Sequence, residues 1–130
     1  MNAAELSALH RDYIDCLNRQ DWPSLGKFVA DDVHYNGELV GLSGYRAMLD
    51  GNYRDIPDLH FNTDLLVCEP PHVACRLRFD CTPAAVFLGL AVYGRKVVFT
   101  ENVFYRFRQG KIVAVWSVVD KAAIEAQLND

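Results

Sequence analysis

Hydrophobic and polar residues alternate over the first thirty positions with the period of an α-helix. One side of the helical wheel carries the hydrophobic residues Leu6, Leu9, Tyr13, Cys16 and Leu17. Charged residues fall on the opposite side, which predicts an amphipathic helix. Asp21 stands before Trp22-Pro23, an N-cap followed by a first-turn proline, and this predicts a second short helix through Val29. The chain is therefore expected to open with a helical hairpin.

The middle of the chain mixes short extended and helical patterns. Residues 33–39 are typical of one or two short strands interrupted by an Asn-Gly pair. Ser43 is a suitable N-cap for a third helix that runs to about Asp55. The proline at position 57 then ends this helix, because a residue before proline avoids the helical conformation.

The second half of the chain has the pattern of β-strands. Four long strands are predicted at about 59–69, 72–81, 95–107 and 112–119, followed by a helix over 121–128. Their short connections make them antiparallel neighbours. Helices followed by long strands predict a single α+β domain over residues 1–130, in which a strongly curved antiparallel sheet wraps around the N-terminal helices. Such a cone has one concave end, where we expect a pocket for a small organic ligand.

Composition and charge exclude several classes of partner. Thirteen Lys and Arg against seventeen Asp and Glu give a net charge of −4, and the basic residues are scattered, so no nucleic-acid partner is expected. The longest apolar run, 83–93, is too short to cross a bilayer, so we expect no membrane partner and a cytoplasmic location. The four histidines lie far apart without ligand spacing, so no metal site is expected.

Four local motifs, taken with the order of the elements, carry a resemblance to a known family. They are Gly44-Tyr45-Arg46-Ala47-Met48-Leu49, Ile56-Pro57-Asp58-Leu59-His60-Phe61, Gly89 with Gly94-Arg95-Lys96-Val97, and Gly110-Lys111-Ile112 followed by Trp116 and Asp120. With them, nearly the whole chain resembles the nuclear transport factor 2-like superfamily and, within it, the SnoaL-like polyketide cyclases.

The resemblance implies a cone-shaped α+β barrel that needs no cofactor and forms a homodimer. Characterised cyclases of this family carry out an intramolecular aldol condensation on a polyketide ester, with an aspartate that matches Asp120 as the acid/base. This sequence also departs from the family. Members commonly carry a histidine in the region matching 80–85, and in this sequence Pro83 stands in its place.

Strand geometry gives an independent reason to consider Asp120. If Phe107 pairs with Ile112 across the turn, period-two alternation puts Glu101 and Asp120 on the same face. Two carboxylates in an apolar enclosure repel each other and lose hydration, so the pKa of at least one would rise. Both are therefore candidate catalytic residues. The alternative is that Asp120 only caps the last helix and that Glu101 lies in solvent.

Candidate ligand-binding residues come from several elements. The same alternation predicts Phe99 and Trp116 as pocket walls, and Tyr13 could point its hydroxyl inward or simply pack in the core. The apolar stretch 84–93, which includes Phe87, is expected to shape or cover the pocket mouth. The remaining candidates are one of His34 and Asn36 on the short strand, and Arg76 as an anchor for a carboxylate.

Three hypotheses of function follow from this pattern. The first is a cofactor-free enzyme that removes and returns a proton on an apolar or carbonyl-bearing small molecule. The second is a non-catalytic binding or dimerisation module of the same fold. The third is an isomerase or epoxide hydrolase of the superfamily. In each case we expect a homodimer through the convex outer face of the long strands, because both faces of these strands carry large apolar residues.

Overall fold

A computed structural model describes residues 1–129 and has the expected order of helices and strands, with one added hairpin. The elements are α1 (Ala3–Asn18), a 3-10 helix η1 (Trp22–Lys27), β1 (Val29–Tyr35), β2 (Glu38–Leu39), α2 (Gly41–Asp55), β3 (Asn62–Glu69), β4 (His72–Cys81), β5 (Val86–Phe87), β6 (Leu90–Ala91), β7 (Val97–Arg108), β8 (Lys111–Val119) and α3 (Lys121–Leu128). The added hairpin, β5–β6, lies in the apolar stretch before β7.

The six main strands form one sheet in the order β2-β1-β8-β7-β4-β3. All neighbours are antiparallel except β1 and β8, which run parallel. A wholly antiparallel sheet was expected from the short connections. That argument holds only for consecutive strands, whereas the long chain between β1 and β8 can return in the same direction.

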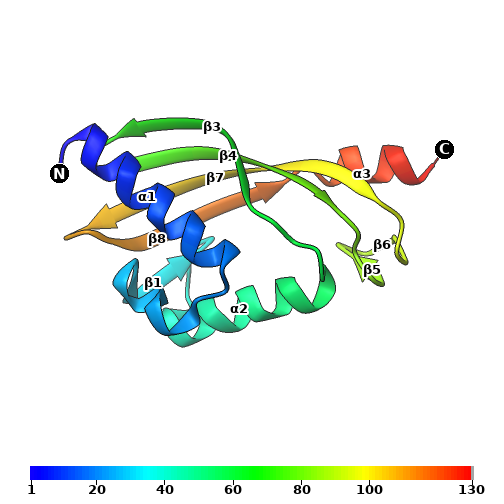
Figure 1. Ribbon diagram of the computed structural model, residues 1–130, viewed down its shortest axis with the longest axis horizontal. Coiled ribbons are helices and arrows are strands. Elements are labelled where there is room, and N and C mark those ends of the chain that lie inside the picture. Colours follow the sequence, from blue (N-terminus) through cyan, green and yellow to red (C-terminus); the bar gives the residue numbers. More distant parts are fainter. Residues whose placement is uncertain (130) are drawn as a thin grey trace.

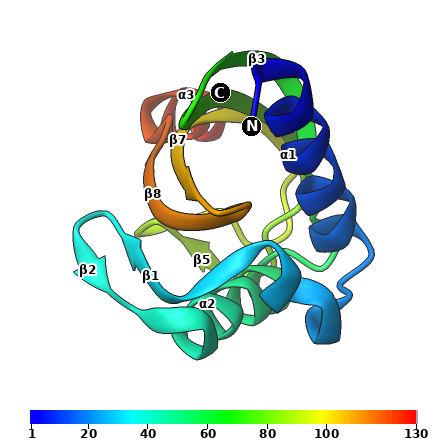
Figure 2. The ribbon, with the colours of Figure 1, turned by 90° about the vertical axis from the view of Figure 1, so that its left-hand side faces the viewer.

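The sheet bends around the interior and the helices close it, as the end-on view in Figure 2 shows. Helix α1 packs against β3 and β4, and α2 against β1. Helix α3 lies beside β7 at the far end of the molecule (Figure 1). This arrangement of N-terminal helices within a curved, mostly antiparallel sheet confirms the expected α+β fold.

Two helix starts differ from expectation. Asp21 precedes η1 without a side-chain capping bond. Helix α2 begins at Gly41, two residues before Ser43, and its N-cap is Val40. Gly41 has φ +70°, a left-handed conformation that favours glycine, so the chain turns into the helix there.

Buried and exposed side chains alternate along the central strands, which shows which face of the sheet lies toward the core. Every second residue of β4 is buried, from Val73 to Cys81, and the same holds for most of β7. The inward row of β7 is Val97, Phe99, Glu101, Val103, Tyr105 and Phe107. Glu101 is the one carboxylate in this row, so the fold places an ionisable group among apolar neighbours.

A β-bulge in β8 reverses the face that the sequence predicted for its second half. Phe107 pairs with Ile112 as expected, but Arg106 pairs with Ala114, which leaves Val113 as an extra residue. A one-residue insertion moves every later side chain to the opposite face. The inward residues after the bulge are Val115, Ser117 and Val119, and the outward residues are Trp116, Val118 and Asp120.

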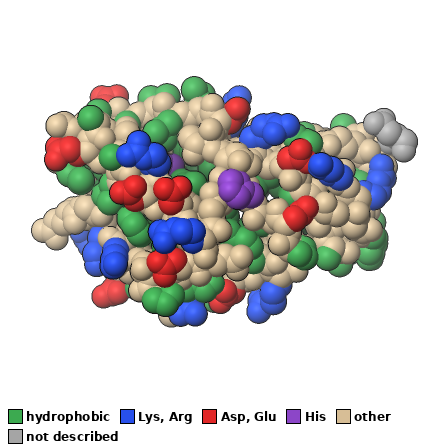
Figure 3. Space-filling model, in the orientation of Figure 1, with side chains coloured by type: hydrophobic (Ala, Val, Ile, Leu, Met, Phe, Trp, Pro, Cys, Tyr) green, Lys and Arg blue, Asp and Glu red, His purple; other side chains and the backbone are tan. Residues whose placement is uncertain are grey.

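Charged side chains of both signs lie interspersed on the face seen in Figure 3. No helix in the described part of the chain is both long and apolar enough to cross a membrane.

Candidate acid/base site

The interior holds a cavity with two chambers that share Tyr35, Asn52, Phe61 and Glu101 as walls. The inner chamber, of about 50 Å³, is enclosed by α1, α2 and the inward faces of β7 and β8. The outer chamber, of about 180 Å³, lies under the β5–β6 hairpin. Glu101 therefore faces both chambers, at the boundary between them.

Glu101 is the one carboxylate among the residues that line the two chambers. The Ser117 hydroxyl donates a short hydrogen bond to its Oε2 atom. Burial raises the pKa of Glu101 above its ordinary value, because the charged form loses hydration, and the hydrogen bond from Ser117 opposes this rise. A carboxyl group with a raised pKa is a stronger base when ionised and a usable acid when neutral.

A pair of buried tyrosines forms the polar end of the inner chamber. The hydroxyls of Tyr13 on α1 and Tyr45 on α2 are 2.6 Å apart and share a hydrogen bond. Burial raises the pKa of both, so both hydroxyls stay protonated near neutral pH. One of the two hydrogens lies between the oxygens, which leaves the second free to donate to a ligand oxygen.

Two further tyrosines line the same space. Tyr35 from β1 lines both chambers, and Tyr105 from β7 lines the inner one. Burial raises the pKa of each, and the nearby carboxylate of Glu101 adds to the effect. The site therefore combines one carboxylate with several hydroxyls that can donate hydrogen bonds.

Ser117 is itself held by an asparagine on the neighbouring strand connection. The backbone N–H of Ser117 donates to Asn36 Oδ1 at 2.8 Å, and Asn36 Nδ2 donates to the Ser117 carbonyl at 3.3 Å. Asn36 has φ +48° in the β1–β2 turn, a conformation that asparagine tolerates well. Asn36 thus fixes the strand position from which Ser117 reaches Glu101.

Replacing Ser117 by Ala is expected to raise the pKa of Glu101 further. The substitution removes a donor that favours the carboxylate, while the burial that disfavours it remains. The measurement is an NMR titration of the Glu101 side-chain carboxyl, with Ser43→Ala, at an exposed position on α2, as the control. An unchanged or lower pKa in the Ser117 variant would contradict this role.

Asp120 and Trp116 lie outside the cavity, which corrects their expected placement. The bulge at Val113 turns both onto the outer face, where Trp116 is 42% exposed. The Asp120 carboxylate is exposed and accepts a hydrogen bond from the Ala123 N–H at 3.1 Å, as an N-cap of α3 does. It does not share a face with Glu101. A catalytic role for Asp120 stays a prediction without support from this placement.

Three other candidates also lie away from the chamber walls. His34 is exposed on the outer face of β1, and Asn36 holds Ser117 from the turn. Arg76 is exposed on the outer face of β4, where its Nε donates to Asn102 Oδ1 at 3.0 Å. The alternation of β4 had left the face of Arg76 open, and pairing with β7 decides it.

The remaining candidates line the cavity. Tyr13 lines the inner chamber, and Phe87 and Phe99 line the outer one. The rings of Phe87 and Phe99 lie 5.8 Å apart, so the β5–β6 hairpin contacts the sheet across the chamber. The stretch 84–93 therefore forms part of the pocket wall.

Tyr45, Asn52 and Ser117 are site residues that the sequence analysis missed. Tyr45 and Asn52 are seven positions apart on α2, with Leu49 between them on the same side of the helix. A polar residue in the buried stripe of an amphipathic helix is a signal that could have identified Asn52. Ser117 gave no such signal, because its face depends on the bulge.

Within residues 1–129, no group of three or more His, Cys, Asp or Glu side chains is arranged to hold a metal ion. The site described above consists of one carboxyl group, hydroxyls, an amide and aromatic walls. The hydroxyls and the amide can form hydrogen bonds, and the carboxyl group can exchange a proton.

Comparisons with known proteins agree with this fold. A family model described as SnoaL-like polyketide cyclase matches residues 7–128. A crystal structure of a SnoaL-like polyketide cyclase from Agrobacterium tumefaciens str. C58 is 51% identical, with 98% of this chain and 99% of that chain covered and a TM-score of 0.94. A search of curated proteins gave no significant match.

More distant structures share the fold. IdmH from Streptomyces antibioticus is 22% identical, with 96% of this chain and 99% of that chain covered and a TM-score of 0.82. TsrD from Streptomyces laurentii is 21% identical, with 98% of this chain and 97% of that chain covered and a TM-score of 0.84. With the family match over almost its whole length, the chain belongs to the SnoaL-like polyketide cyclase family.

Proposed function

We propose that this protein is a cofactor-free enzyme that transfers a proton at a carbon beside a carbonyl group, with Glu101 as the acid/base. The observation that carries the proposal is the position of Glu101 between two chambers, with hydroxyl donors on the inner side and aromatic walls on the outer. Family membership supports the same class of chemistry, because an intramolecular aldol condensation begins with such a proton transfer.

The proposed reaction needs only groups of this chain. The Glu101 carboxylate accepts the proton, and the electron pair of the C–H bond forms an enolate. The free hydroxyl hydrogen of the Tyr13–Tyr45 pair donates to the enolate oxygen, where negative charge develops. The enolate carbon then either takes the proton back or attacks a second carbonyl of the same molecule. In the second case a C–C bond forms, and Glu101 returns its proton to the new alkoxide.

Hydrogen exchange in D₂O tests this proposal. Phenylacetone has a CH₂ group beside its carbonyl, and we expect the protein to exchange these hydrogens faster than buffer alone, followed by proton NMR. An exchange rate equal to that of buffer, with phenylacetone shown to bind, would contradict the proposal and leave a ligand-binding protein without this activity.

We further propose that two copies of the chain pair through the outer face of the sheet. Two adjacent rows of cross-strand neighbours cover β3, β4, β7 and β8. The first row is Val67, Ala74, Phe104 and Trp116, and the second is Leu65, Arg76, Asn102 and Val118. Phe104 is 56% and Val118 71% exposed, and soluble monomers rarely leave such a continuous apolar patch uncovered.

A second copy fits this face because the same apolar rows would meet in a closed two-fold pair of packed sheets. The polar pair inside the patch, Arg76 and Asn102, is already hydrogen bonded, which lowers the cost of covering it. The bulge places Trp116 and Val118 on this face, whereas Val115 and Val119 point inward.

Replacing Phe104 by Asp is expected to shift the protein from dimer to monomer, because the change removes an aromatic contact and puts a charge that must lose its hydration at the centre of the interface. Light scattering at micromolar concentration measures the mass. Tyr93→Ser is the control, at an exposed aromatic residue beside the β5–β6 hairpin and outside the main sheet. A wild-type mass of only 14.7 kDa would disprove the dimer.

A further inference from the structure

We infer that the ligand of the two chambers is an uncharged molecule with a single ring and at least one carbonyl group, and that Phe87 sets its maximum size. The inference rests on the proposed function, since it assigns the substrate class of the same site. It is argued from the charge, the wall and the volume of the cavity.

The charge of the cavity disfavours an ionic ligand. Among the described residues that line the two chambers there is no Lys, Arg or His, and Glu101 is the sole carboxylate. A carboxylate or phosphate would face Glu101 without a cation to pair with, at a large desolvation cost. An ammonium group could pair with the Glu101 carboxylate, but burying such an ion pair costs more than the attraction returns unless further hydrogen bonds satisfy both groups. It would also leave the free hydroxyl of the tyrosine pair without an acceptor.

The wall of the outer chamber suits a flat ring. Aromatic side chains follow one another along it, with Phe61 and Phe79 edge to face at 5.5 Å, and Phe79 and Phe99 stacked at 5.2 Å. Phe87 continues the series from the hairpin, 5.8 Å from Phe99. Aromatic rings pack well in offset and edge-to-face arrangements. A ring in this chamber would therefore contact aromatic surface on several sides.

The volume of the outer chamber limits the ligand to about one ring. An apolar cavity of roughly 150 Å³ is known to hold benzene, and this chamber measures about 180 Å³. The inner chamber, at about 50 Å³, has room for little more than a carbonyl group beside the tyrosine pair. A second fused ring would compete with the Phe87 side chain for the remaining space.

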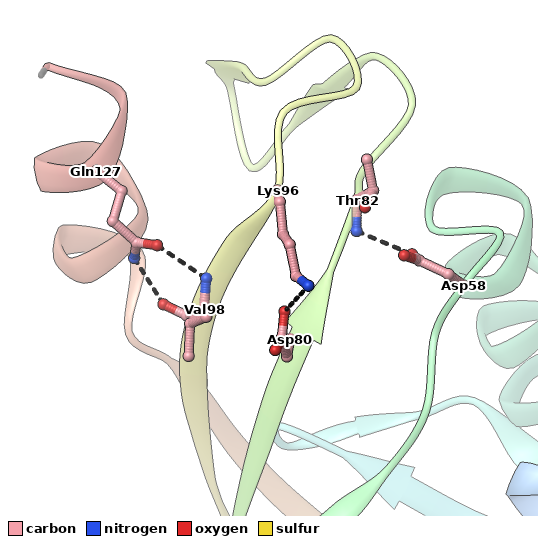
Figure 4. Close-up of polar contacts among 6 residues, drawn as sticks. All are labelled: Asp58, Asp80, Thr82, Lys96, Val98 and Gln127. Atoms are coloured by element: carbon pink, nitrogen blue, oxygen red, sulfur yellow. Dashed lines mark hydrogen bonds and ion pairs between the residues drawn. The ribbon is translucent and has the colours of Figure 1, made fainter.

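The Phe87 side chain can be shortened without moving the backbone, because the β5–β6 hairpin that carries it is held by hydrogen bonds at its base. The Thr82 N–H donates to the Asp58 carboxylate at 2.8 Å, as Figure 4 shows. The Gly94 N–H donates to the Pro83 carbonyl at 2.8 Å, and Val92 is fully buried. Shortening Phe87 should therefore enlarge the chamber and leave the hairpin in position.

Binding of a matched set of probes tests the inference in the intact protein, by ligand-observed NMR and calorimetry. Phenylacetone is the one-ring ketone, phenylacetate and phenethylamine are its anionic and cationic counterparts, and 1-(2-naphthyl)propan-2-one is the two-ring ketone. Phenylacetone is expected to bind at least about tenfold more tightly than the other three.

Phe87→Ala should tighten binding of the two-ring ketone at least about tenfold, since it opens space beside Phe99. Phe87→Leu is the milder variant if the first folds poorly. Val86→Ala, at an exposed position of the same hairpin, should change nothing. Equal or tighter wild-type binding of either ion, or of the two-ring ketone, would overturn the inference.

This test is separate from that of the proposed function. Binding does not require the acid/base, so selective binding without hydrogen exchange would uphold the ligand class and reject the catalytic role. Hydrogen exchange on phenylacetone together with tight binding of the two-ring ketone would uphold the catalytic role and reject the ligand class.

Discussion

Replacing Glu101 by Gln is expected to lower the rate of hydrogen exchange on phenylacetone about 10²- to 10⁴-fold, the usual contribution of a general acid/base. Gln keeps the shape and can still accept the hydrogen bond from Ser117, but it cannot take up a proton. Binding of the neutral ketone should be largely kept. Kinetics by NMR, with calorimetry for the dissociation constant, separates the two effects.

Asp120→Asn is the matched control, because it makes the same chemical change at the other candidate carboxylate. Asn is as good an N-cap as Asp, so the hydrogen bond from the Ala123 N–H is retained and the stability of α3 should hardly change. We expect exchange at the wild-type rate. A loss of activity in Asp120→Asn with normal activity in Glu101→Gln would assign the acid/base to Asp120 and reject the proposed site.

The second large effect concerns His10, whose imidazole should make the protein sensitive to acid. The ring lies on the buried side of α1, 1% exposed, with its edge toward Tyr105 at 4.7 Å between ring centres. Its Nε2 atom has no hydrogen-bond partner within residues 1–129. Burial lowers the pKa of His10 from 6.5 to about 4, because the charged form cannot be hydrated there.

The direction of the pH effect follows from this lowered pKa. Between pH 6.5 and 4 the unfolded chain binds a proton at His10 that the folded chain does not. The contribution of neutral His10 to the free energy of unfolding is therefore fully present above pH 6.5. It is lost as the pH drops toward 4, by about 3 kcal/mol. His10→Phe should remove this part of the pH dependence, since a phenyl ring fills the site without taking up a proton.

Urea unfolding at pH 7 and pH 4.5 gives the loss in the free energy of unfolding for the wild type and for the variant. The difference between the two losses is the contribution of His10, because the carboxylates are the same in both proteins. His34→Gln, at an exposed imidazole on β1, is the control and should behave like the wild type. If His10→Phe loses as much stability as the wild type over this range, His10 is not the source of the acid sensitivity.

Most of the architecture follows from local patterns in the sequence. The helical period around Tyr13 predicted α1 and its buried side, and the period-two pattern from Val73 to Cys81 predicted β4 as a strand but left its inward face open. Glu101 was also identified, because it shares a strand with regularly spaced apolar residues. A regular period assigns the residues of an element to its two sides, and it identifies the buried side where only one of them is apolar.

Tertiary structure decided the identity of the site. Both faces of β8 after Ile112 are apolar, so hydrophobic pattern cannot reveal the extra residue at Val113. That bulge exchanges the faces, taking Trp116 and Asp120 out of the interior and bringing in Ser117. The tyrosine pair likewise joins positions 13 and 45, which only the packing of α1 near α2 brings within hydrogen-bond distance. Local periodicity fixes the faces of an element, whereas strand register and helix packing depend on contacts between residues far apart in the sequence.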